Sequence, residues 1–220
     1  MASILFSRRY LYIEIITLSV VMPLLLYFFV SQRWLLGALW LITIYSGWSY
    51  RKLHHTKHLR ALWDWAAVKE WSLWRPILWR FTYSAFFLTL MTLLLVPDRW
   101  FAFPREQPQL WLMVMILYPL ISVIPQEFIF RTYFFKRYQT IFPKAKHMLW
   151  VSSLAFGFAH IILQNWVAVG LTTMGGFYFA NTYQKRQSLA LVSLEHALYG
   201  CFIFTIGLGW FFYSGAPHKW

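Results

Sequence analysis

The sequence is built from long apolar runs separated by short polar segments. A helix needs about 20 mostly apolar residues to cross a bilayer, where only helices and closed barrels satisfy their backbone polar groups. Hydrophobic residues make up 60% of the 220 residues and charged residues only 12%, so a water-soluble globule would lack the polar surface to cover them. We therefore predict an all-α, polytopic membrane helix bundle of about seven transmembrane helices, with six or eight as alternatives. The runs cover residues 10–30, 34–50, 77–96, 110–135, 148–166, 167–183 and 189–213.

The charge is strongly positive, with 20 Lys and Arg residues against seven Asp and Glu residues and a net charge of +13. The cations gather in short clusters between the apolar runs, at residues 8–9, 51–60, 136–146 and 185–186. This distribution is typical of the positive-inside rule and argues against a nucleic-acid-binding face. Seven spans place all four clusters on one side. The pattern predicts a cytoplasmic N-terminus, contacts with anionic lipid headgroups and, from the short loops, a bacterial inner-membrane protein.

The segment between the second and third runs is polar and rich in tryptophan. Its three histidines, His54, His55 and His58, stand among cations, which disfavour a further positive charge nearby. We interpret them as part of a basic interfacial loop rather than a metal site. Residues 63–74 then mix tryptophans with charged residues, which is typical of an amphipathic segment lying in the membrane interface.

Prolines and glycines divide two of the apolar runs. Pro119 and Pro125 fall inside the fourth run, and proline breaks or kinks a helix because it removes a hydrogen bond and clashes with the preceding turn. In lipid such a break persists only where protein or a watery cavity satisfies the freed backbone groups. The sequence therefore predicts an interrupted fourth helix. The last run is long enough to tilt or break at Gly207 or Gly209.

Ionisable side chains inside the runs are candidate functional groups, because each costs about 2.5–3.5 kcal/mol on membrane-insertion scales. Glu127 and Arg131 stand four residues apart, so they share a helix face and can pair. Arg131 is expected to hold a helix or a carboxylate in place. The full set that we single out is Glu14, Glu127, Arg131, His160, Glu195 and His196.

Glu127, His160 and His196 lie on three separate runs and form the candidate site. A glutamate and a histidine together can activate water for attack on a carbonyl group, and a second histidine can donate a hydrogen bond to the developing oxyanion. The same three side chains could instead bind zinc, although the sequence contains no His-Glu-x-x-His motif. It contains no Gly-x-Ser-x-Gly motif for a serine nucleophile either. Cys201 is predicted to be a packing residue.

Residues 119–209 resemble the CPBP intramembrane proteases, which include eukaryotic CAAX prenyl endopeptidases and bacterial proteins linked to bacteriocin maturation or self-immunity. The family's motifs are Glu-Glu-x-x-x-Arg, Phe-x-x-x-His and His-x-x-x-Asn. Their counterparts here, in the same order, are Gln126-Glu127-Phe128-Ile129-Phe130-Arg131, Phe156-Gly157-Phe158-Ala159-His160 and His196-Ala197-Leu198-Tyr199-Gly200. We predict a single membrane domain over residues 1–220. Residues 1–109 would supply anchor helices and the interfacial segment, and residues 110–214 the CPBP-like core.

The resemblance implies an intramembrane endopeptidase that needs no cofactor, with a zinc enzyme as the alternative. In the roles it implies, Glu127 with His160 activates water, His196 stabilises the oxyanion and Arg131 orients Glu127, with Phe156 as a supporting residue. The implied substrate is a membrane-associated protein or peptide that is reached from the bilayer.

Two positions depart from the family pattern: Gln126 replaces a glutamate assigned to water activation, and Gly200 replaces an asparagine assigned to oxyanion stabilisation. A glutamine amide cannot act as a general base. Either Glu127 has taken over the role, which requires a local shift of the backbone, or the chain is a catalytically impaired scaffold or bacteriocin self-immunity factor. Gln126 could also supply an amide donor in place of the asparagine. A small transporter is a further alternative, but the spans show no repeated halves.

Overall fold

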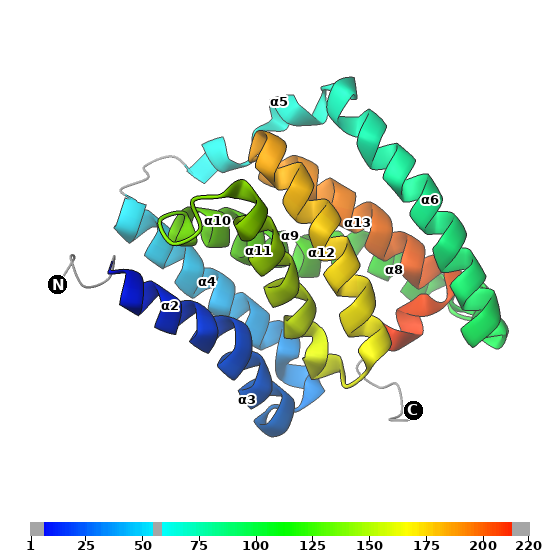
Figure 1. Cartoon of the computed structure of the whole chain (residues 1–220). Helices are drawn as coiled ribbons and strands as arrows, with labels where there is room; N and C mark the ends of the chain where they lie inside the picture. The colour runs from blue at the N-terminus through cyan, green and yellow to red at the C-terminus, as the bar shows by residue number, and fades with distance from the viewer. Residues whose placement is uncertain (1–6, 55–58, 213–220) are drawn as a thin grey trace.

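The computed structural model describes residues 7–54 and 59–212. Every element in these two ranges is helical (Figure 1), which confirms the predicted all-α membrane bundle. His55 and His58 of the predicted interfacial loop lie outside the described residues.

Five helical segments are long and apolar enough to cross a membrane, so the chain is an integral membrane protein. They are Arg8–Phe29, Trp71–Leu95, Pro108–Tyr138, Ala145–Leu163 and Leu189–Ile206.

Two further helices, α4 (Leu35–His54) and α12 (Trp166–Arg186), fill the remaining predicted runs. They contain 20 and 21 residues, enough to cross a hydrocarbon core of about 30 Å at about 1.5 Å per residue. Both are less apolar than the five segments above. That they also span the membrane therefore stays a prediction.

The first part of the chain forms a helical hairpin, and a short helix then precedes the next long one. α2 (Arg8–Ile16) and α3 (Met22–Phe29) are joined by a π-helical stretch and are followed by α4. The short helix α5 (Trp65–Val68) precedes α6 (Trp71–Leu95). α6 therefore begins six residues before the predicted start at residue 77. Arg75, which the prediction left in the loop, belongs to its exposed first turns, from which a long cationic side chain can reach the interface.

The fourth run is one continuous 31-residue helix, Pro108–Tyr138, so the predicted interruption is wrong. Its α-helical parts are α8 (Pro108–Tyr118), α9 (Ile124–Glu127) and α10 (Phe134–Tyr138). The parts between them, Pro119–Val123 and Phe128–Tyr133, are π-helical. Pro125 leaves the carbonyl oxygen of Ile121 without its helical donor, and Nε1 of Trp40 in α4 donates to that oxygen at 3.0 Å. The neighbouring helix thus satisfies the freed backbone group.

The hairpin of α11 (Ala145–Ala159) and α12 is packed closely enough to require glycine. A Cβ atom on Gly157 would overlap Thr173 Oγ1 and lie 2.9 Å from Thr173 Cα. A Cβ atom on Gly176 would lie 3.1 Å from the carbonyl oxygen of Ser153. Small residues let membrane helices approach this closely.

α13 (Leu189–Ile206) ends at Gly207, one of the two predicted break points. Gly207 has φ +113°, a conformation that glycine adopts at little cost. A Cβ atom there would overlap the carbonyl oxygen of Arg99. The chain continues as a 3₁₀ turn over Leu208–Phe212.

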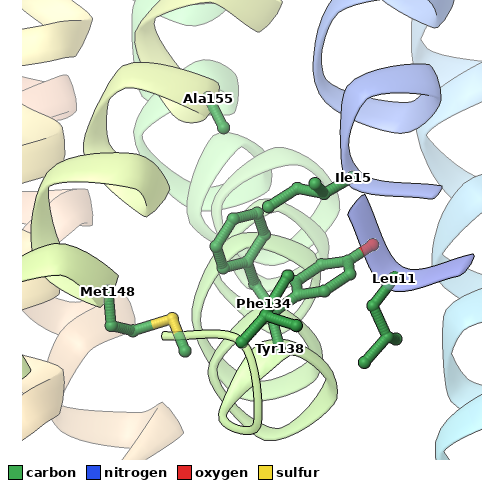
Figure 2. Close-up of a cluster of buried hydrophobic side chains, with 7 residues drawn as sticks. Leu11, Ile15, Phe134, Tyr138, Met148 and Ala155 are labelled. Atoms are coloured by element: carbon green, nitrogen blue, oxygen red, sulfur yellow. The ribbon is translucent and has the colours of Figure 1, made fainter. Parts of the chain in front are cut away.

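A buried apolar cluster fixes α2 against α10 and α11 (Figure 2). Tyr138 points from α10 toward α2, and Met148 and Ala155 of α11 close the cluster from the other side. Its members are Leu11, Ile15, Phe134, Tyr138, Ile141, Met148 and Ala155. Beside it, Glu14 accepts hydrogen bonds from Arg137, at 2.8 Å from Nε and 2.5 Å from Nη2. Glu14 is therefore half of a structural ion pair that joins α2 to α10.

The basic clusters meet at one end of the bundle. A polar cavity of about 820 Å³ there is lined by Arg60, Lys136 and Arg186, which come from three of the four clusters. Arg186 also pairs with Asp64 and Glu70, at 2.9 and 2.8 Å. This agrees with the predicted one-sided distribution, whereas the side of the membrane that this end faces stays a prediction.

Candidate active site

Glu127 lies at the centre of the bundle, at the point where α9 passes into the second π-helical stretch. Its side chain is completely buried. Oε1 accepts a hydrogen bond from Nδ1 of His196 in α13 at 2.8 Å, and Oε2 lies 3.3 Å from Nε of Arg131. The Arg131 contact is an ion pair without a well-aligned hydrogen bond. A buried carboxylate is costly unless it is paired in this way. The pairing predicted from the spacing of Glu127 and Arg131 is therefore present.

Arg131 is also completely buried and connects Glu127 to the α11–α12 hairpin. Nη1 donates to Oγ of Ser152 at 3.0 Å, and Nη2 donates to the carbonyl oxygen of Gly176 at 3.4 Å. The guanidinium group lies 5.0 Å from the ring centroid of Phe156, within cation–π range. These contacts fit the prediction that Arg131 holds a carboxylate in place.

His196 continues the network beyond Glu127. Its Nε2 lies 3.1 Å from the hydroxyl of Tyr118, which ends α8. Its ring is stacked on Phe179 at a centroid distance of 4.5 Å and meets Phe156 edge-on at 5.6 Å. An ionised carboxylate can only accept a hydrogen bond, so Nδ1 carries the proton toward Glu127. Nε2 of the neutral ring is then the acceptor, and the Tyr118 hydroxyl donates to it.

His160 also contacts Phe156 and lies just after the end of α11. Its Nδ1 donates to the carbonyl oxygen of Phe156 at 2.8 Å, and the two rings are 4.8 Å apart. No hydrogen bond within the described part of the chain joins His160 to Glu127. The structure thus brings Glu127 and His196 into direct contact and places His160 one aromatic ring away. The resemblance pairs Glu127 with His160 for water activation, whereas here the His160 ring is hydrogen-bonded to the backbone of its own helix.

The two positions that depart from the resemblance lie in different surroundings. Gln126 Nε2 donates to Oγ of Ser122 at 2.8 Å, one turn earlier on the same helix. Its buried Oε1 has no hydrogen-bond partner among the described residues. At Gly200, a Cβ atom would overlap the Tyr118 ring and hydroxyl and lie 2.6 Å from Cζ. Tyr118 therefore occupies the space that a side chain at position 200 would need.

The zinc alternative does not fit this arrangement of side chains. Within residues 7–54 and 59–212, no three His, Cys, Asp or Glu side chains are grouped so that they could hold a metal ion. Both ring nitrogens of His196 already have partners, Glu127 and Tyr118. A metal ion bound by both His160 and His196 would require the contacts of His196 with Glu127 and Tyr118 to be broken.

An apolar cavity of about 370 Å³ reaches the outer end of the network. Tyr118, Phe156 and His196 form its inner wall, whereas Glu127 lies behind His196 and does not line it. On the outer side, Tyr83 and Phe87 of α6 and Met174 of α12 are exposed. In a membrane these exposed side chains face lipid. The cavity therefore connects the Tyr118–His196 contact with the lipid-facing surface.

Glu195, the neighbour of His196, belongs to a separate structural network. Nη2 of Arg80 donates to Glu195 Oε1 at 2.9 Å and to Oγ1 of Thr182 at 2.8 Å, which joins α6 to α13 and α12. Sequence reasoning did not single out Arg80, although an arginine inside the third apolar run was a usable signal. It also missed Tyr118, for which no signal exists, because tyrosine is common in membrane helices.

Comparison with known proteins identifies the core of the chain. The chain is a polytopic helical membrane protein with a carboxylate–histidine pair buried at its centre. The family model described as type II CAAX prenyl endopeptidase Rce1-like matches residues 108–202, from the start of α8 to within α13. This segment is a domain of the Rce1-like CAAX endopeptidase (CPBP) family, which confirms the resemblance. No curated protein and no solved structure matches the chain.

Proposed function

We propose that the protein is an intramembrane endopeptidase that hydrolyses peptide bonds of membrane-associated substrates with Glu127 and His196. One observation carries the proposal: the hydrogen-bonded series Glu127–His196–Tyr118 is fully buried at its carboxylate end and borders an apolar cavity at the other. Carboxylate, imidazole and an outer proton donor form the usual constellation for acyl-transfer chemistry.

The tautomer of His196 supports its role as the general base. When a water molecule attacks the substrate carbonyl carbon, Nε2 accepts a proton from the water, and Glu127 stabilises the resulting imidazolium. Collapse of the tetrahedral intermediate breaks the C–N bond, and Nε2 returns the proton to the leaving amine. The products are a carboxylic acid and an amine. Glu127 then acts through His196 rather than on the water, which differs from the roles expected from the sequence.

His160 stays in the proposed site as a second, indirect member. Its Nδ1–H bond to the Phe156 carbonyl leaves Nε2 as the acceptor nitrogen of the neutral ring. Because Phe156 contacts both histidine rings, His160 can influence His196 through the position of Phe156. We expect its loss to affect catalysis less than the loss of His196.

The cavity supports a substrate with an apolar segment. Its wall is mainly aromatic and aliphatic, and its outer residues belong to α6 and α12. A peptide segment that resides in the bilayer can therefore approach His196 between these two helices without passing through water. The end of the bundle with the basic clusters is proposed to face the cytoplasm.

Replacing His196 with alanine is expected to lower kcat by about 10²- to 10⁴-fold, the usual contribution of general acid–base catalysis. The test uses the full chain reconstituted in lipid vesicles. The probes are synthetic peptides with one apolar segment of about 20 residues and a fluorophore–quencher pair, with and without a prenylated C-terminal cysteine. His147, which lies in the first turn of α11 at the basic end, supplies the matched control variant His147→Ala. Equal cleavage by wild type and His196→Ala would contradict the assignment.

A second candidate function is a catalytically impaired scaffold or self-immunity factor, and the observation that favours it is Gln126. Its buried, unpartnered Oε1 stands where the related proteases have a glutamate. If Glu127 and His196 suffice, Gln126→Glu should change kcat by less than about threefold, because the side chain contacts Ser122 and not the network. The measurement is the same cleavage assay. A wild type without activity that gains cleavage with Gln126→Glu would instead identify an impaired enzyme.

A further inference from the structure

The hydroxyl of Tyr118 is the outermost polar atom of the buried network. It lies 3.1 Å from His196 Nε2, and both residues line the apolar cavity. We infer that Tyr118 is a catalytic residue whose O–H group donates a hydrogen bond to the carbonyl oxygen of the scissile peptide bond. This inference rests on the proposed peptidase function and names the oxyanion donor of that site.

His196 is poorly placed to donate this hydrogen bond itself. Its side chain is only 8% exposed, and the rings of Phe179 and Phe156 pack against it. Its single proton points to Glu127, so Nε2 offers a lone pair and not a donor. A carbonyl oxygen that enters the cavity therefore needs a donor from another residue, and the neighbouring Tyr118 hydroxyl has one.

The space around Gly200 supports the same assignment. The Cβ atom of a side chain at position 200 would lie within 2.6 Å of Cε1, Cζ and the hydroxyl oxygen of Tyr118, so the two positions compete for one volume beside His196. The ring of Tyr118 is held edge-on against Phe204 at 5.2 Å. The helix changes from α-helical to π-helical geometry directly after Tyr118, at Pro119. In this chain the polar group beside His196 comes from α8 instead of from position 200 in α13.

The proposed step needs rotation of one bond and no transfer of the phenolic proton. In the resting state the O–H group points to Nε2 of His196. When a substrate carbonyl arrives, the O–H group turns about the Cζ–O bond and donates to the carbonyl oxygen, and this frees Nε2 to accept a proton from water. The hydrogen bond strengthens as negative charge develops on the oxygen, which stabilises the transition state more than the bound substrate.

The test compares cleavage of the vesicle-bound peptide probes by wild type and Tyr118→Phe, which keeps the ring and removes only the hydroxyl. Loss of one oxyanion donor typically lowers kcat by about 10²- to 10³-fold, and we expect this loss with KM changed by less than about twofold, since ground-state binding is retained. Tyr12→Phe is the matched control, because Tyr12 is an exposed tyrosine of α2 that does not line the cavity. It should cleave as wild type does.

A swap of the two positions gives a second readout that packing alone would not produce. Tyr118→Ala opens the space beside Gly200, and the double variant Tyr118→Ala/Gly200→Asn puts an amide donor into it. We expect at least a tenfold higher kcat for the double variant than for Tyr118→Ala. Gly200→Asn alone should be inactive or unfolded, because its side chain overlaps Tyr118.

The outcomes distinguish the role of Tyr118 from the peptidase function on which it rests. If wild type cleaves and Tyr118→Phe cleaves at the same rate, the role of Tyr118 is overturned while the peptidase proposal stands. An increased KM with unchanged kcat would also overturn it, since it would indicate a role in binding only. If wild type leaves every probe intact, the proposed function itself fails, and the role of Tyr118 fails with it.

Discussion

Replacing Glu127 with glutamine is expected to lower kcat for peptide cleavage by about 10³- to 10⁴-fold, as loss of the histidine-orienting carboxylate does in other hydrolases. The carboxylate has two functions in the network: it fixes the proton of His196 on Nδ1 and stabilises the imidazolium that forms during the reaction. A glutamine amide can also donate to Nδ1, which favours the opposite tautomer and leaves Nε2 protonated before the reaction. The measurement is kcat and KM for the vesicle-bound peptides.

Glu14→Gln is the matched control for this variant. Glu14 is likewise a membrane carboxylate with an arginine partner, Arg137, but it joins α2 to α10 away from the cavity. We expect Glu14→Gln to lower the unfolding temperature without a comparable loss of kcat in the protein that remains folded. If Glu127→Gln retained wild-type kcat, Glu127 would be a structural residue only.

The largest expected effect on stability comes from Arg131→Met. Removing one partner of a buried ion pair typically costs about 3–5 kcal/mol, because the other charge stays buried without compensation. Arg131 also donates to Ser152 and Gly176, so its loss weakens the attachment of Glu127 to α11 and α12. The free energy of unfolding in detergent or lipid, followed by denaturant titration, measures the effect.

A double-mutant cycle separates the ion pair from packing. In Glu127→Gln/Arg131→Met both charges are absent, so we expect the double variant to be destabilised by less than the sum of the single variants. Arg137→Met, which breaks the structural pair with Glu14, provides a comparison of similar chemistry. Strictly additive costs would show that Glu127 and Arg131 do not stabilise each other.

The sequence predicted those parts of the molecule that depend on local pattern. Apolar runs of membrane length gave the helices, and the four-residue spacing of Glu127 and Arg131 gave their pairing. Gly207 was one of two predicted break points. Each of these depends on a property of one helix, which a single sequence carries.

The parts that the sequence did not predict depend on contacts between helices. Pro119 suggested a broken helix, whereas the surrounding bundle retains a continuous one with π-helical stretches. The partner of Glu127 is His196 and not His160, since the end of α11 binds His160 to its own backbone. Tyr118 could not be selected because its importance arises from the missing side chain at Gly200, more than 80 residues away along the chain.

The central claim is that the Glu127–His196 pair hydrolyses a peptide bond inside the membrane, and ¹⁸O incorporation tests it most directly. The reconstituted chain is incubated with the peptide probes in H₂¹⁸O, and the products are analysed by mass spectrometry. The account predicts that wild type produces shortened peptides with one ¹⁸O atom in the new carboxyl group, and that Glu127→Gln and His196→Ala produce them at least about 100-fold more slowly. Labelled products in equal amount from wild type and both variants, or intact peptides throughout, would contradict it.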